Sequence, residues 1–173
     1  MSGQYPKLIT LQDSDIGSTE PAPEIYVERV AARAVVFDTE GKVALFHSTV
    51  KQYHKLPGGG VEAGEDIETA LRRELMEEIG CEVDSITEIG MIEEYRNRFS
   101  LHQLSYCFTA HVVGEKGTPH LEEGEIAEGF ITEWMDLDTA IKTLENEEDV
   151  DDYQGKFIQI RDLLFLKEAK KVI

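Results

Sequence analysis

The sequence predicts an α/β sandwich, in which strands form a sheet and helices pack against it. Residues 26–37, with the sequence YVERVAARAVVF, are typical of a long strand. Residues 65–79 and 154–171 instead repeat apolar side chains at helical spacing. Because strand-like segments precede the first helix and separate it from the second, we expect helices and strands to share one core.

The beginning of the chain differs in composition from the rest of it. Residues 1–25 contain Pro6, Pro21 and Pro23 among small polar residues, which predicts a loosely attached arm. Within it, the apolar segment 7–11 predicts either an edge strand or a contact with a partner subunit. The sequence thus divides into an N-terminal arm, residues 1–25, and one globular domain, residues 26–173.

Further elements are expected in order within the globular domain. Residues 42–48 are expected to pair with residues 26–37 across the turn at Thr39-Glu40-Gly41, and Gly80 is placed to end the first helix. The remaining predicted elements are two long strands at 83–96 and 101–113 joined near Asn97, a strand at 130–135, and helices at 137–144 and 154–171. Residues 114–126 and the acidic run 145–152 are expected to be loops.

Acidic side chains outnumber basic ones by 35 to 17, which leaves a net charge of −18 in 173 residues. Such a field repels DNA, RNA and anionic membranes, so neither nucleic acid nor membrane is an expected partner. It also repels a phosphate-bearing substrate unless metal ions mask the site. Cys81 and Cys107 have neither disulfide-framework nor zinc-site spacing and are expected to be reduced core thiols of a cytoplasmic protein.

Residues 59–81, GGVEAGEDIETALRRELMEEIGC, carry the strongest chemical signal. Glu74, Glu77 and Glu78 project into one sector of the helix, because residues three and four apart share a face. Two of them, Glu74 and Glu78, border the apolar stripe formed by Ile67, Leu71, Leu75 and Ile79. Carboxylate oxygens suit Mg²⁺ or Mn²⁺, but a solvated acidic face explains the same pattern. Helix geometry alone leaves both interpretations open.

The spacing of this segment resembles the Nudix box of the Nudix hydrolase family over all 23 positions, Gly59 to Cys81. The shared positions are Gly59, Glu65, Arg73-Glu74-Leu75, Glu77-Glu78 and Gly80, and Cys81 replaces the usual final aliphatic residue. A pattern with this many specified positions is far more specific than a lone glycine motif. The resemblance implies the Nudix fold, a mixed β-sheet sandwiched between α-helices, and metal-dependent hydrolysis of a diphosphate.

The resemblance also implies roles for individual residues. Glu74, Glu77 and Glu78, with the carbonyl of Gly58, would bind Mg²⁺ or Mn²⁺, and Glu74 would orient or deprotonate the attacking water. Arg73 would support the site through a salt bridge, for which Glu65 is the expected partner. Several family members also recruit a glutamate from a downstream loop. The sequence does not choose among Glu122, Glu123, Glu125 and Glu128, each of which is also explained as a surface carboxylate, and Glu125 is the leading candidate.

Substrate contacts must come from outside this segment. Tyr53 and His54 precede the glycines and are candidates to stack on a base or sugar, although such residues commonly pack in a core. Arg33 is a candidate to pair with a phosphate, as are Arg96 and Arg98.

In the strand 101–113, Gln103 and Ser105 share one face and are weaker pocket candidates. The opposite, more apolar face, formed by Leu104, Tyr106 and Phe108, is expected to be core. The other histidines have no ligand-like spacing; they are His47, His102, His111 and His120.

The leading hypothesis is a metal-dependent Nudix hydrolase that cleaves a diphosphate bond in a nucleoside di- or triphosphate derivative by water attack at phosphorus. A nucleotide sugar, ADP-ribose or a dinucleotide is the alternative substrate. A non-catalytic Nudix module that binds a ligand and regulates is the alternative of another class, although such modules generally lose carboxylates that this chain keeps. Because family members are often homodimers, a second copy of the chain is an expected partner.

Overall fold

Strands and helices alternate along the chain in the order that the α/β prediction requires. The computed structural model describes residues 5–173, and within them eight strands form one mixed sheet. The strands are β1 (Lys7–Leu11), β2 (Val27–Phe37), β3 (Val43–Ser48), β4 (Tyr53–Lys55), β5 (Gly58–Gly60), β6 (Glu82–Arg96), β7 (Leu101–Val113) and β8 (Phe130–Met135). The α-helices are α1 (Ile67–Ile79), α2 (Glu123–Ala127), α3 (Leu137–Glu145) and α4 (Tyr153–Val172), with short 3₁₀ turns η1 (Asp13–Ile16) and η2 (Asn97–Phe99).

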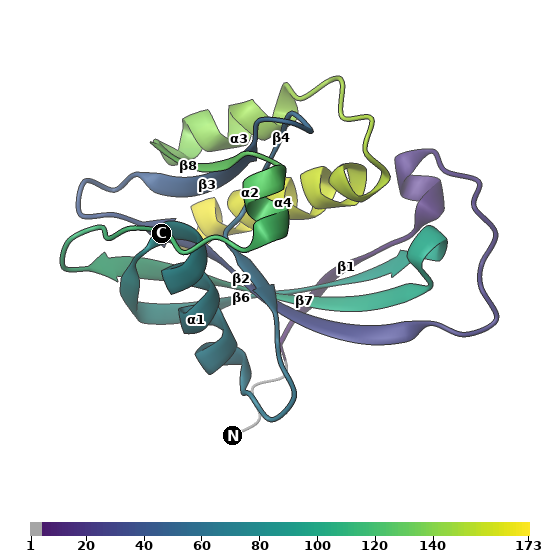
Figure 1. Cartoon of the computed structure of the whole chain (residues 1–173), viewed down its shortest axis with the longest axis horizontal. Coiled ribbons are helices and arrows are strands. Elements are labelled where there is room, and N and C mark those ends of the chain that lie inside the picture. Colours follow the sequence, from purple (N-terminus) through teal and green to yellow (C-terminus); the bar gives the residue numbers. More distant parts are fainter. Residues whose placement is uncertain (1–4) are drawn as a thin grey trace.

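The sheet runs in the order β1-β6-β7-β2-β3-β4, while β5 pairs with β2 and β8 pairs with β3. It is mixed because β1 and β6, and also β2 and β7, are parallel, whereas the other neighbours are antiparallel. Figure 1 shows α3 and α4 on one side of the long strands and α1 on the other. This arrangement confirms the expected sandwich.

Alternation along β2 divides the core into two layers. Val35 and Phe37 face the layer that also contains side chains of α3 and α4, whereas Ala34 and Val36 face the layer beneath α1. Successive side chains of a strand point to opposite faces, so a strand covered on both sides is apolar throughout, as the second half of β2 is.

Helix α1 begins and ends where local chemistry stabilises its ends. The Asp66 carboxylate accepts a hydrogen bond from the backbone N–H of Thr69 at 2.8 Å, which caps the first turn. Gly80 ends the helix in the left-handed conformation, φ 66°, as predicted. A Cβ at this position would also overlap the backbone of Gly117, so glycine is required for two reasons.

Three features add to, correct or refine the sequence predictions. Residues 58–60 form strand β5, because their backbone pairs with Ala31 to Arg33 of β2 although glycines have low strand propensity. Residues 123–127, expected to be loop, form the short helix α2. Residues 7–11, within the predicted arm, form an edge strand parallel to β6, which selects one of the two alternatives for that segment.

A buried ion network joins α4 to the sheet. The Arg161 guanidinium donates to Asp162 at 2.7 Å and to Glu94 of β6 at 3.3 Å, and all three side chains are fully buried. Asp162 also accepts the backbone N–H of Leu56 at 2.8 Å. Arg96 donates to Glu94 at 2.8 Å. Burial by itself would raise the pKa of Glu94, but Arg161 and Arg96 together hold it well below its usual range.

We predict that Arg161→Met lowers the free energy of unfolding by about 3–5 kcal/mol, because two buried carboxylates lose their shared cation. Urea denaturation measures the change. Lys167→Met, which removes a charge from an exposed position of the same helix, is the matched control and should change stability by about 0.5 kcal/mol or less. Equal losses in the two variants would contradict the role of the network.

Candidate active site

A polar pocket of about 170 Å³ lies where β5 and α1 meet β2 and α4. Candidates named from the sequence that line it are Gly58, Glu74, Glu77, Glu78, Arg33, Arg96, Glu122 and Glu125. The other lining residues are Arg29, Lys55, Gly59, Gly60, Gln154 and Ile158. Residues that lie far apart along the chain therefore converge on one small space.

Arg73 fastens the glycine segment to α1. Its guanidinium forms the expected salt bridge with Glu65, with N···O distances of 2.9 and 3.0 Å, and also donates to the carbonyl of Gly60 at 2.9 Å. A third contact, at 2.8 Å, joins it to Glu74. Because Arg presents several donors in a rigid planar fork, one side chain can hold the turn, the strand and a site carboxylate together.

Glu78 is the most buried of the three carboxylates, with 2% of the residue exposed. It accepts the backbone N–H of Gly58 at 2.7 Å and lies 3.4 Å from the Lys55 ammonium. The pKa of Glu78 is raised to about 8, chiefly by burial; the nearby Glu125 carboxyl contributes to the rise, and Lys55 and the Gly58 N–H oppose it. This glutamate thus belongs to the core side of α1, as the helical wheel indicates.

Glu74 and Glu77 both contact Arg73, at 2.8 and 3.4 Å. Burial raises the pKa of Glu74, with Arg73 opposing and Glu77 adding to the shift. The Glu74 carboxyl also packs against the backbone of Gly59, since a Cβ there would lie 2.4–2.6 Å from carboxyl atoms. A larger residue at this position would displace the carboxylate from its present place.

Gly58 has a backbone conformation that side chains rarely adopt, φ +133°, and a Cβ would lie 2.2 Å from the Ala32 carbonyl oxygen. Its N–H is bonded to Glu78, and its carbonyl accepts a hydrogen bond from Arg33 at 3.3 Å. The carbonyl proposed from the resemblance as a metal ligand therefore contacts a guanidinium group, while the N–H of the same residue contacts a carboxylate.

The structure distinguishes among the four downstream glutamates. Glu125, on α2, is half-buried in the pocket and close enough to Glu78 to affect its pKa. Glu122 also lines the pocket but is exposed, Glu123 is exposed outside it, and Glu128 pairs with Lys51 at 3.0 Å. The arrangement favours Glu125.

Basic side chains form the opposite wall of the pocket. Arg29 lies at the mouth, and Arg33 and Arg96 are almost completely buried, with 5% and 3% exposed. Burial and the neighbouring Arg161 lower the pKa of Arg33 to about 10. Gln103 and Ser105, expected as weak pocket candidates, are instead fully buried beneath this wall, where both donate to Glu94.

Tyr53 and His54 lie outside this pocket. The Tyr53 ring is 2% exposed and packs with Phe130, so its position is that of a core residue. His54 contacts Glu133 at 3.1 Å. Burial opposes the charged form of His54, but hydrogen bonds with Glu147 and Glu133 outweigh it and raise the pKa of the imidazole. Arg98, on η2, pairs with Glu20 at the far end of the sheet.

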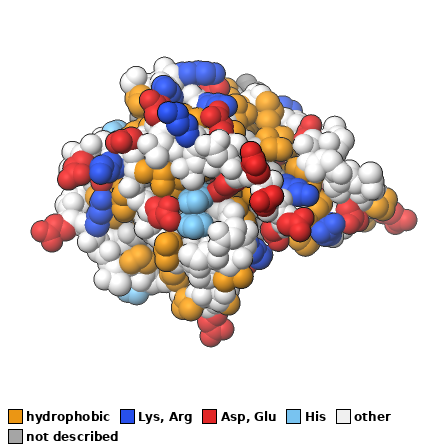
Figure 2. All heavy atoms as spheres, turned by 90° about the horizontal axis from the view of Figure 1, so that it is seen from above, with side chains coloured by type: hydrophobic (Ala, Val, Ile, Leu, Met, Phe, Trp, Pro, Cys, Tyr) orange, Lys and Arg blue, Asp and Glu red, His pale blue; other side chains and the backbone are white. Residues whose placement is uncertain are grey.

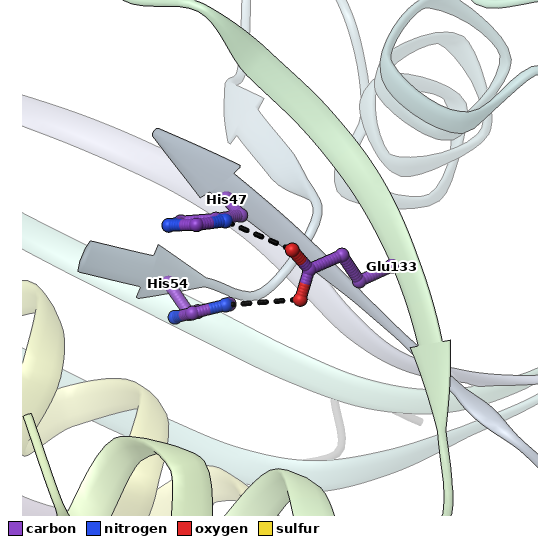
Figure 3. A group of neighbouring side chains, drawn as sticks. All are labelled: His47, His54 and Glu133. Atoms are coloured by element: carbon purple, nitrogen blue, oxygen red, sulfur yellow. Dashed lines mark hydrogen bonds and ion pairs between the residues drawn. The ribbon is translucent and has the colours of Figure 1, made fainter. Parts of the chain in front are cut away.

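Sequence spacing missed a histidine cluster formed by His47, His54 and Glu133 (Figure 3). Histidine side chains gather beside acidic ones in the middle of the face seen in Figure 2. The two imidazoles stack at 4.0 Å and 10°, and each gives one nitrogen to a different oxygen of Glu133. A metal ion lies near the plane of each imidazole that binds it, and the planes of two stacked rings do not meet at a nearby point. The geometry therefore suits two hydrogen bonds to one carboxylate better than shared binding of one metal ion.

A model of the NUDIX domain matches residues 27–159, which is more than half of the chain. The chain belongs to the NUDIX family. No curated protein matches it closely enough to add to this assignment.

Solved Nudix structures share the fold of this chain. A MutT NUDIX hydrolase from Burkholderia pseudomallei is 24% identical, covering 65% of this chain and 85% of its own, with a TM-score of 0.51. A NUDIX hydrolase from Nitrosomonas europaea is 20% identical; the match covers 76% of this chain and 88% of that protein, with a TM-score of 0.57. A MutT protein from Methanosarcina mazei Go1 is 16% identical over 87% and 99%, with a TM-score of 0.55. These likenesses establish the fold.

Nudix hydrolases generally use divalent metals, and the oxygen donors of this pocket fit such a cation. Buried carboxylates with raised pKa values are groups that a cation would stabilise. In this structure Arg73 and Lys55 partly neutralise them. The one compact three-ligand group among residues 5–173 is the histidine cluster, so the carboxylates of Glu74, Glu77 and Glu78 must move closer together to share a cation.

We predict that Glu65→Gln destabilises this Nudix domain at neutral pH and that the difference from wild type shrinks in acid. Arg73 lowers the pKa of Glu65 from 4.5 to about 2. The carboxylate therefore stabilises the fold fully above pH 4.5 and loses that effect as the pH falls through 2. Urea denaturation between pH 7 and pH 3 tests this. Glu68→Gln, at an exposed partner of Arg72, is the control, and a difference that stays constant with pH would contradict the prediction.

Proposed function

We propose that this chain is a metal-dependent Nudix hydrolase that cleaves a diphosphate bond in a nucleoside di- or triphosphate derivative. Family membership supports a hydrolase that acts on pyrophosphate bonds. The observation that carries the finer proposal is the convergence of Glu74, Glu77, Glu78 and Glu125 with basic side chains in one pocket. Hard cations bind the oxygens of carboxylates and phosphates, and guanidinium groups bind phosphates directly.

Glu74, Glu77, Glu78 and the Gly58 carbonyl would hold Mg²⁺ or Mn²⁺. Such a cation supplies positive charge that polarises phosphate oxygens and lowers the pKa of water. The residues of the chain then supply position and proton transfer. Glu74 is suited to accept the proton of the attacking water, because burial raises its pKa and Arg73 holds one of its oxygens.

The proposed reaction is attack of water at phosphorus with rupture of the P–O bond to the bridging oxygen. Arg73 and Glu65 contact neither water nor substrate in this proposal but hold Glu74 and the Gly60 carbonyl in place. Glu125 is proposed to act with Glu78 from across the pocket. Among the substrate-contact candidates, Arg33 lines the pocket and stays in the proposal, whereas the positions of Tyr53 and His54 do not support a contact there.

Other substrates and a binding role are the competing proposals. A nucleotide sugar, ADP-ribose or a dinucleotide contains the same diphosphate, and a panel of these compounds with Mg²⁺ or Mn²⁺ distinguishes them by turnover. Tight binding without turnover of any compound would support a regulatory module. A homodimer, a cytoplasmic location, the absence of nucleic-acid partners and the division at residue 25 stay predictions. Within the described residues, no helix is long and apolar enough to cross a membrane.

We expect Glu74→Gln and Glu78→Gln each to lower kcat on the best panel substrate on the order of a hundred-fold or more, since each removes a charge that metal binding or proton transfer needs. Steady-state kinetics at several Mg²⁺ concentrations measure the effect. The matched control is Glu68→Gln on the exposed face of the same helix, which should keep wild-type turnover. Unchanged turnover in Glu78→Gln would sink the metal-site proposal.

A second comparison tests the assignment on α2. Glu125→Gln is expected to lower kcat about ten-fold or more, whereas Glu123→Gln, two residues away and outside the pocket, should leave it unchanged. Circular dichroism of both variants checks that the overall secondary structure is intact. Equal turnover in the two variants would show that Glu125 does not take part.

A further inference from the structure

The basic wall of the pocket is built from two strands, β2 and β6, which flank β7 in the sheet. Arg29 and Arg33 are four residues apart on β2 and therefore point to the same face. Arg96, at the end of β6, lines the same pocket. In a chain with a net charge of −18, three arginines on one side of a small pocket are a marked local reversal of sign.

In and beneath this wall, the buried arginines outnumber the buried carboxylates that contact them. Arg33, Arg96 and Arg161 are buried, and the buried carboxylates in contact with this group are Glu94 and Asp162. Glu94 is shared between Arg96 and Arg161, whereas Arg33 has no carboxylate partner among the described residues. An unpaired buried cation is costly, so the arrangement favours a further anion.

Hydrogen-bonding capacity is also left over. Arg33 donates to the Gly58 carbonyl and Arg96 donates to Glu94, yet the Nε atom of each is buried with no partner within residues 5–173. Buried donors in proteins nearly always have partners, and each exception needs an explanation. Both side chains line the pocket. A ligand in the pocket that accepts these hydrogen bonds, after a small shift of the guanidinium groups, explains both exceptions.

The wall lies close to the proposed metal site. A Cβ on Gly60 would lie 3.0 Å from an Arg29 nitrogen, and a Cβ on Gly59 would touch the Glu74 carboxyl. The glycines of β5 thus separate the arginines from the glutamates by the width of a backbone. At about 170 Å³, with no aromatic side chain among the described lining residues, the pocket suits phosphate groups better than a stacked base.

We infer that Arg29, Arg33 and Arg96 form an anion subsite that binds a phosphate group of the substrate directly, without a metal ion. The inference rests on the proposed function in taking that phosphate to be part of a diphosphate substrate. In this arrangement the pocket recognises the phosphates of the substrate, and the base lies outside the pocket. Substrates that differ in base but share a phosphate chain are then expected to have similar KM values.

The first test measures anion binding without metal. Inorganic pyrophosphate in the presence of EDTA is expected to raise the melting temperature of wild type more than NaCl of matched ionic strength does. Glu78→Gln should keep that rise, whereas Arg29→Gln and Arg33→Met should lose most of it. Arg72→Met, which removes one guanidinium outside the pocket, is the charge-matched control and should keep it.

Stability without ligand separates a binding role from a structural one. Because Arg33 has no carboxylate partner among the described residues, Arg33→Met should melt at or above the wild-type temperature when no pyrophosphate is present. A lower melting temperature together with an intact pyrophosphate response would assign Arg33 a structural role and overturn the inference. Arg29→Gln, at the exposed mouth, provides the same readout if Arg33→Met does not fold.

The second test measures the steady-state kinetics of the arginine variants with Mg²⁺. Arg29→Gln and Arg33→Met are expected to raise KM about ten- to a hundred-fold, with a smaller change in kcat, because charge-assisted hydrogen bonds to phosphate are lost. A pyrophosphate response that is equal in wild type, Arg29→Gln and Arg33→Met overturns the subsite even if turnover is normal. A response that depends on the arginines with no turnover of any substrate instead supports the subsite and rejects the proposed hydrolase.

Discussion

The buried ion network of Arg161, Asp162 and Glu94 is the interaction on which both the fold and the pocket depend. It joins α4 to β6 in a fully buried environment, where separating the charges is far more costly than at the surface. Through the bond from the Leu56 N–H to Asp162, it also positions the chain two residues before Gly58. The glycine strand that faces the carboxylates of α1 is therefore held from the opposite side of the sheet as well.

Two signs of charge are kept apart within the pocket by the backbone of β5. The glutamates of α1 stay close together because Arg73 and Lys55 offset their repulsion, whereas among the arginines of β2 and β6 only Arg96 pairs directly with a carboxylate, that of Glu94. Glycine is required at residue 58, where a side chain would collide with the backbone of β2, and a side chain at residue 59 would displace the Glu74 carboxyl. A protein with an excess of acidic residues can in this way present positive charge to a phosphate.

Predictions from the sequence succeeded where the cause is local. The period of α1, its end at Gly80 and the pairing of Arg73 with Glu65 depend on residues within about two helical turns of one another. They failed for α2, which is too short to show a periodic pattern, and did not include β5, whose strand character comes from its pairing with β2. The face of β7 with Gln103 and Ser105 was also misjudged, because polar side chains can be fully buried when a partner such as Glu94 accepts their hydrogen bonds.

By itself, the sequence determined the α/β sandwich, the helix with its three carboxylates and the membership of the chain in the Nudix family. These three features depend on periodicity and on spacing along the chain. The tertiary structure alone decided that Glu125 approaches Glu78, that Arg29, Arg33 and Arg96 share one wall, and that His47 and His54 meet at Glu133. Each of these contacts joins segments far apart in sequence, such as α2 with α1 or β8 with β3. Their proximity follows from strand order and register, which no local pattern encodes.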